Sequence, residues 1–153
     1  MLPLFNALLL AQLALRSAPL IRARLAGALP DSGIRFTGAV AAPPEGSGAQ
    51  WVQGSAELVP EGPGRALLLL HLTKGDPGRE HAFQLFEGRC GDDAMIVPVM
   101  APAIAVIAEN GRANAAELLD LDLAATSTYH VNVRASANGT GSLAGCADLT
   151  MRR

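Results

Sequence analysis

The chain carries little charge and almost no lysine. Charged residues make up 17% of its 153 residues, and the formal net charge at pH 7 is −2. Lys74 is the single lysine, and no run of Lys or Arg occurs anywhere in the sequence. The chain therefore lacks the basic stripe that a nucleic-acid-binding protein presents, and we expect no nucleic-acid partner.

Aromatic residues and cysteines are also scarce. Aromatics account for only 4% of the chain and apolar residues for 50%, so the core has to be built mainly from Leu, Val, Ile and Ala. The two cysteines, Cys90 and Cys146, are too few for a disulfide-dense scaffold, and no Cys-x-x-Cys pair indicates structural zinc. On their own they fit either two buried free thiols or one bridge that closes a long loop.

Several enzyme motifs are missing. The sequence has neither the G-x-S-x-G elbow of a hydrolase nor the G-x-x-x-x-G-K loop that holds phosphates. The chain has three histidines, His71, His81 and His130, and each lies on a different expected strand. None of them has a second metal ligand two or four residues away. We interpret them as surface or hydrogen-bonded residues, with His81 and His130 as weak candidates for metal ligands.

The first segment is strongly apolar. Leu2–Leu15 is too short for a comfortable membrane span of about 20 residues, but its length suits the core of an export signal. A small-residue cleavage pattern follows at Ala26-Gly27-Ala28, although the positive charges come after the apolar run instead of before it. We expect residues 1–29 to be a degenerate or truncated signal, or else a retained amphipathic helix or anchor. Membrane contact is expected only through residues 2–15.

Residues 30–153 have the pattern of one β domain. Alternating or apolar runs bounded by turn residues predict strands at 34–40, 51–59, 65–72, 81–86, 128–134 and 143–151. Met95–Ile107 contains two prolines, so we expect two short edge pieces there. Ala115–Leu123 fits a helical turn or a strand, and we interpret its second half as a strand. About eight strands with frequent turns favour an all-β antiparallel Greek-key sandwich or flattened barrel.

Three of these segments resemble strands of a known family. The run from His81 to Gly88, followed by Cys90, resembles the copper strand of Cu/Zn superoxide dismutases and of the related CHRD-type β-sandwich domains. Tyr129–Ser136 resembles their Val-x-Val-His strand, and Leu143–Leu149 resembles their C-terminal strand with its cysteine. The resemblance extends over about residues 34–151, and it implies a β-sandwich with a disulfide between Cys90 and Cys146.

The metal ligands of that family are replaced in this chain. The resemblance places Gln84 and Phe86 where copper ligands stand in the family, and Arg134 at the histidine of the Val-x-Val-His strand. An amide is a poor copper ligand, a phenyl ring cannot ligate, and an arginine brings a permanent positive charge. We therefore expect no cofactor and no dismutase activity.

Strand alternation assigns these residues to faces. Phe83 and Leu85 are expected in the core together with Val131 and Val133. The opposite face is then expected to be either a solvated surface or a patch that binds a ligand or partner, formed by Gln84, Phe86, Asn132 and Arg134.

The leading hypothesis is a non-catalytic, exported β-sandwich domain with a binding or structural role at the cell envelope or outside the cell. Its partner would be an unknown protein or small molecule. The alternative hypothesis is a divergent metal-binding protein or enzyme of the superoxide dismutase-like group, with a site that includes His81, His130 and nearby aspartates.

Overall fold

A computed structural model describes residues 33–43, 51–92, 97 and 101–153 of the chain. The expectations for residues 1–29 lie outside these described residues. No helix within the described part is long and apolar enough to cross a membrane. The described residues form eight strands: β1 (Arg35–Val40), β2 (Gln53–Pro60), β3 (Ala66–Lys74), β4 (Glu80–Glu87), β5 (Ala103–Val106), β6 (Ala113–Leu119), β7 (Tyr129–Arg134) and β8 (Leu143–Arg152).

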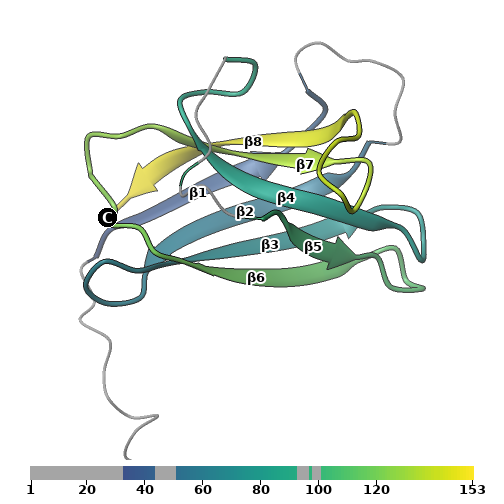
Figure 1. Cartoon of the computed structure of the whole chain (residues 1–153), viewed down its shortest axis with the longest axis horizontal. Helices are drawn as coiled ribbons and strands as arrows, with labels where there is room; N and C mark the ends of the chain where they lie inside the picture. The colour runs from purple at the N-terminus through teal and green to yellow at the C-terminus, as the bar shows by residue number, and fades with distance from the viewer. Residues whose placement is uncertain (1–32, 44–50, 93–96, 98–100) are drawn as a thin grey trace, which may run out of the picture. The chain divides into compact units, whose positions relative to one another are not determined.

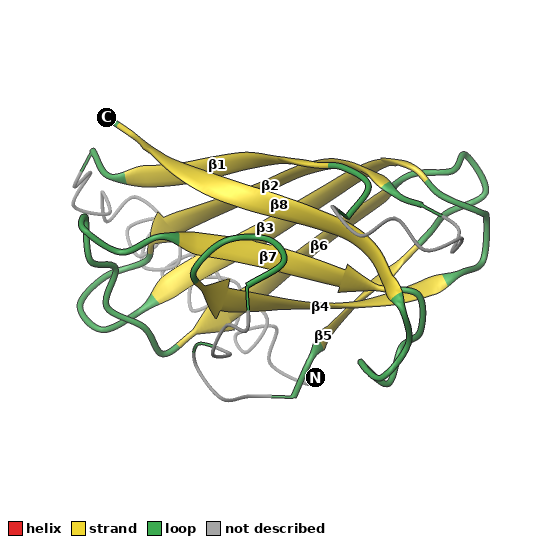
Figure 2. Cartoon of the chain, turned by 90° about the horizontal axis from the view of Figure 1, so that it is seen from above, coloured by secondary structure: helices red, strands yellow, loops and turns green. Residues whose placement is uncertain are grey.

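All eight strands belong to one antiparallel sheet with the order β5-β4-β7-β8-β1-β2-β3-β6 (Figure 1). The sheet folds into two layers, with β1, β2, β3 and β6 on one side and β4, β5 and β7 on the other (Figure 2). The long β8 pairs with β7 in one layer and with β1 in the other. The end strands β5 and β6 follow one another through a tight turn, so the sheet nearly closes into a flattened barrel. The all-β fold class predicted from the sequence is therefore confirmed.

The core lies between the two layers. Strands contribute a buried side chain at alternate positions, as in β3, where Ala66, Leu68, Leu70 and Leu72 are all at most 2% exposed. Leu, Val and Ala make up most of the core, as the composition predicts. Phe36 and Tyr129 add an edge-to-face aromatic pair with ring centroids 5.2 Å apart. Full burial of each large apolar side chain stabilises the fold by about 1.5–3 kcal/mol.

One predicted strand lies earlier in the chain than the sequence indicated. The second half of 115–123 was expected to be a strand, but β6 ends at Leu119 because its pairing with β3 is complete there. Leu121 and Leu123 pack against the core from a loop without ladder hydrogen bonds. The carboxylate of Asp122 accepts a hydrogen bond of 2.8 Å from a backbone N–H in the β2–β3 turn, which holds this loop in place.

Candidate functional site

The predicted patch, formed by Gln84, Phe86, Asn132 and Arg134, was expected on the outward surface of β4, β7 and β8. Phe83, Leu85, Val131 and Val133 all lie in the core, at most 2% exposed, as the alternation predicts. Their neighbours in sequence therefore point outward. Across the sheet, the register places Gln84 opposite Asn132 and Phe86 opposite His130 on the outward side.

This outward face is covered, although the sequence predicted a solvated surface or an open patch. Phe86 is 8% exposed and His130 only 1% exposed. Their rings stack with centroids 5.2 Å apart and an angle of 15° between the planes. Gln84 and Asn132 are half-buried beside them. The outward face of these strands is thus a second, smaller packed layer.

A disulfide provides part of the cover. Cys90 follows β4 and is bonded to Cys146 of β8, with the two Cα atoms 6.0 Å apart. Because β7 separates β4 from β8 in the sheet, the Gly88–Asp92 loop has to cross the outward side of β7 to reach Cys146. The pairing that the family resemblance implied is confirmed.

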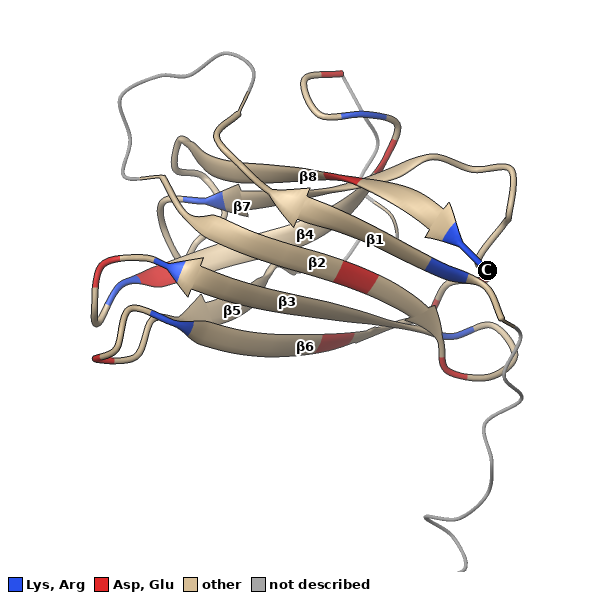
Figure 3. Ribbon diagram, turned by 180° about the vertical axis from the view of Figure 1, so that it is seen from behind, with Lys and Arg blue, Asp and Glu red and all other residues tan. Residues whose placement is uncertain are grey.

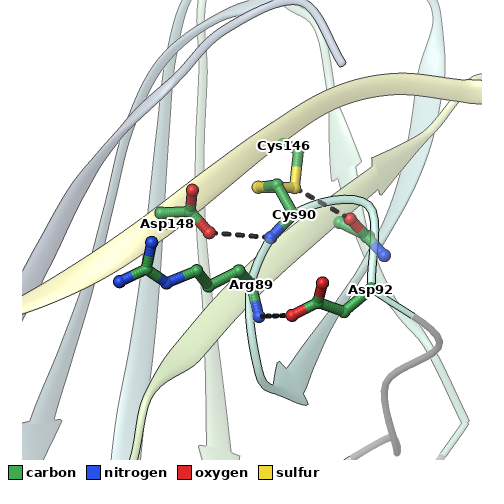
Figure 4. Close-up of a disulfide and its surroundings, with 6 residues drawn as sticks. Arg89, Cys90, Asp92, Cys146 and Asp148 are labelled. Atoms are coloured by element: carbon green, nitrogen blue, oxygen red, sulfur yellow. Dashed lines mark hydrogen bonds between the residues drawn. A yellow bond between two sulfur atoms is a disulfide. The ribbon is translucent and has the colours of Figure 1, made fainter. Parts of the chain in front are cut away.

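Hydrogen bonds fix the loop on both sides of the disulfide (Figure 4). The backbone N–H of Cys90 donates to Oδ1 of Asp148 on β8 over 2.7 Å, and the N–H of Arg89 donates to Oδ2 of Asp92 over 2.9 Å. Oδ1 of Asn132 lies 3.1 Å from the sulfur of Cys146. Since a disulfide sulfur carries no hydrogen, this last approach is a close contact and not a hydrogen bond.

The two weak metal-ligand candidates lie on opposite faces of the sheet. His81 shares the inward parity of Phe83 and is 2% exposed, and its Nδ1–H donates to the backbone carbonyl of Arg134 over 2.9 Å. His130 points outward, and its buried Nδ1 has no hydrogen-bond partner among the residues that the structure describes. The structure therefore does not bring His81 and His130 into one site. Within the described ranges, no group of three His, Cys, Asp or Glu side chains is arranged to hold a metal ion.

Arg134 is held by the turn that joins β7 to β8. Its Nη1 donates to the carbonyl of Gly141 over 3.2 Å, and the side chain is half-buried. A register irregularity between Val133 and Arg134 interrupts the regular pairing with β8 at this point. Of the four residues predicted as a patch, Gln84, Phe86 and Asn132 share one packed face, while the guanidinium of Arg134 serves the turn.

The sequence reasoning missed a groove on the outward side of the opposite layer. Two shallow, open hollows of about 460 and 390 Å³ adjoin there and share Ser55. We call them together the outer groove, which is lined by residues 37–42, 53–55, 73, 148, 150 and 152 from β1, the chain just after it, β2, β3 and β8. Small residues at neighbouring positions, such as Ala39 and Ser55, are the only signal in the sequence, and it becomes meaningful once the register is known.

Comparison with known proteins leaves the family open. No family model matches the chain, and no curated protein matches it significantly.

Proposed function

We propose that the chain is a non-catalytic binding domain of the superoxide dismutase-like and CHRD-type group that works outside the cytoplasm, at the cell envelope or beyond it. The observation that carries this proposal is the disulfide between Cys90 and Cys146, seated on the face where the family would hold its metal. Disulfides form and persist in oxidising compartments and are rare in the cytosol. This chemistry supports the proposed extracytoplasmic location.

The packing beneath the disulfide supports a non-catalytic role. A catalytic site needs convergent ionisable groups that a substrate can reach. On this face Phe86 stacks on a buried His130, and the loop that carries Cys90 crosses above the strand between β4 and β8. Gln84 and Phe86 occupy the ligand positions of the resembled family, and neither side chain supports copper. The scaffold is retained while the residues that would perform the metal chemistry are replaced.

The outer groove supports a binding role. It extends from β3 across β2 and β1 to β8, where Asp148 adjoins the disulfide loop, and its floor of small side chains leaves room for a ligand on an otherwise regular sheet surface. Ser55, at the junction of the two hollows, is exposed, and so are Gln53 and Thr73 at one end. The groove is therefore the surface through which we expect the domain to engage a partner.

Thiol trapping in intact cells tests the compartment. Cells that express the full chain are treated with a membrane-permeant alkylating reagent, fractionated, and the recovered protein is unfolded and weighed by mass spectrometry. We expect extracytoplasmic protein in which neither cysteine is alkylated until a reductant is added. A Cys90→Ser variant, which leaves Cys146 unpaired, is the matched control for reagent access. Wild-type protein recovered in the cytoplasm with both thiols alkylated would contradict the proposal.

A further inference from the structure

The outer groove runs along β1 on the outward side of the barrel. One hollow is lined by Thr37, Ala39 and Ser55 together with Asp148 and other residues of β8, and the second continues past Ser55. Figure 3 views the molecule from this side and shows β1, β2, β3 and β6 in front, with few charged positions along the middle of these strands. Most of the groove lining is therefore uncharged, and its charged residues, Asp148 and Arg152, both come from β8.

Two glycines let the strands that line the groove approach one another closely. A Cβ atom at Gly38 would lie 2.2 Å from the backbone oxygen of Asp148, and one at Gly54 would lie 1.9 Å from the backbone oxygen of His71. Neither position can accept a side chain unless a neighbouring strand moves. A β-bulge beside Gly54 also interrupts the ladder, with Thr73 left out of the pairing. Bulges of this kind re-aim side chains and are common next to binding sites.

The polar groups that line the groove retain hydrogen-bonding capacity. Asp148 uses Oδ1 to accept the Cys90 N–H, which leaves its second oxygen as an acceptor held in a fixed orientation. The hydroxyl of Thr150 donates to the carbonyl of Thr37 over 3.3 Å, so its oxygen lone pairs remain as acceptors. Ser55 and Gln53 are exposed and make no side-chain hydrogen bond with any residue that the structure describes.

The charges at the groove balance, which disfavours an ionic ligand. Asp148 and Arg152 contribute one charge of each sign to the lining. Beside Arg152, the guanidinium of Arg35 binds the carboxylate of Glu57 over 2.8 Å, so these two charges neutralise one another. A polyanion or polycation would find no excess of opposite charge here. A neutral ligand rich in hydroxyl groups fits the lining better.

An exposed tryptophan comes two residues before Gln53 of the groove lining. Val52 is buried in the core at 1% exposure, whereas the next residue, Gln53, is exposed and lines the groove. Trp51 is 49% exposed. An indole ring in this setting offers an apolar face and a polar N–H to a ligand. The ring faces of sugars, which carry C–H groups, pack well against such a surface.

We propose that the outer groove binds an uncharged oligosaccharide. The sugar hydroxyls pair with Asp148, Ser55 and Gln53, and one ring packs against Trp51. This inference rests on the proposed binding role and adds the chemical class of the ligand. The disulfide contributes indirectly, because the Cys90 N–H that it holds in place orients the Asp148 carboxylate.

Trp51 is the only tryptophan of the chain, so its fluorescence reports on any ligand that reaches its ring. The purified full chain is titrated with neutral hexasaccharides, namely cellohexaose, maltohexaose and chitohexaose, and with hexagalacturonate as the charged comparison. We expect at least one neutral hexasaccharide to shift the Trp51 emission to shorter wavelength and to bind measurably by calorimetry. Hexagalacturonate is expected to bind more weakly.

Two leucine substitutions localise the binding. Ala39→Leu fills the groove, whereas Ala116→Leu adds the same group at an exposed outward position of β6, away from the groove. We expect the first to weaken binding by about tenfold, equivalent to about 1.4 kcal/mol, and the second to leave it within about twofold. Circular dichroism confirms that both variants are folded.

Failure of this inference is distinguishable from failure of the proposed function. If no neutral hexasaccharide binds, if the charged one binds more tightly, or if Ala39→Leu leaves binding intact, the oligosaccharide assignment is wrong. Each of these results leaves the disulfide and the extracytoplasmic location as they are. Free thiols in the trapping experiment would instead overturn the proposed function, whatever the groove binds.

Discussion

Removal of the disulfide should cost the domain a large share of its stability. The bridge joins residues 56 positions apart, and the chain-entropy relation gives about 4 kcal/mol for a loop of that length at 25 °C. Domains of this size unfold with net free energies of about 5–15 kcal/mol, so the loss is close to the whole margin at the lower end. We therefore predict that Cys90→Ala/Cys146→Ala lowers the free energy of unfolding by about 4 kcal/mol.

The thermal effect follows from the same value. For a domain of this length, 1 kcal/mol corresponds to about 3–5 °C in melting temperature, so the double variant should melt about 12–20 °C below the wild type. Urea unfolding followed by far-ultraviolet circular dichroism gives the free energy itself. The m-value should also rise, because the unfolded chain without its cross-link exposes more surface.

Two controls make the comparison decisive. Wild-type protein melted in the presence of a reductant should reproduce the double variant, and the double variant itself should not respond to the reductant. If the double variant fails to fold, the fall in melting temperature of the wild type with reductant takes its place. A loss of less than about 1 kcal/mol would refute the reasoning, because the cross-link would then not restrict the unfolded chain as the loop-closure relation requires.

Two further predictions concern backbone contacts and buried polar atoms. Gly38→Ala and Gly54→Ala should each destabilise the fold by about 2 kcal/mol or more, because the added Cβ meets a backbone oxygen. Ser55→Ala is the control and should change the free energy of unfolding by less than about 0.5 kcal/mol. Equal effects in urea unfolding would contradict the close approach. His81→Leu should cost about 1–3 kcal/mol more than His130→Leu, because only His81 satisfies a backbone carbonyl while Nδ1 of His130 is unpartnered. A greater loss for His130→Leu in the same assay would contradict this.

Alternation in the sequence was sufficient to place most strands and their faces. The runs around Phe83 and Val131 predict strands whose inward residues are buried in the structure. The position of β6 could not be found in this way, because Leu119, Leu121 and Leu123 alternate identically whether or not they join a ladder. The end of the strand is decided by pairing with β3, which stops at Ala66 opposite Leu119.

The burial of Phe86 and His130 in the predicted patch could not be foreseen from the sequence. Sequence patterns place Phe86 and His130 on the outward side of the sheet, and polar neighbours on the same face favour a solvated surface. Both rings are nevertheless buried in the structure, where the loop with Cys90 also reaches Cys146 across β7, a path that follows from the strand order and the disulfide together. The outer groove could not be predicted from the sequence either. It forms from short segments of four strands, and these segments meet only through the register of the sheet.

Metal content of the native protein tests the central claim most directly. Full-length protein is isolated from its own compartment without chelators or added metal, and copper and zinc are measured by inductively coupled plasma mass spectrometry against protein concentration. The proposed replacement of the family's ligand positions by Gln84, Phe86 and Arg134, together with the burial of His130 against Phe86, predicts far less than one equivalent of either metal. One tightly bound equivalent of copper or zinc would contradict the account of a domain without metal chemistry.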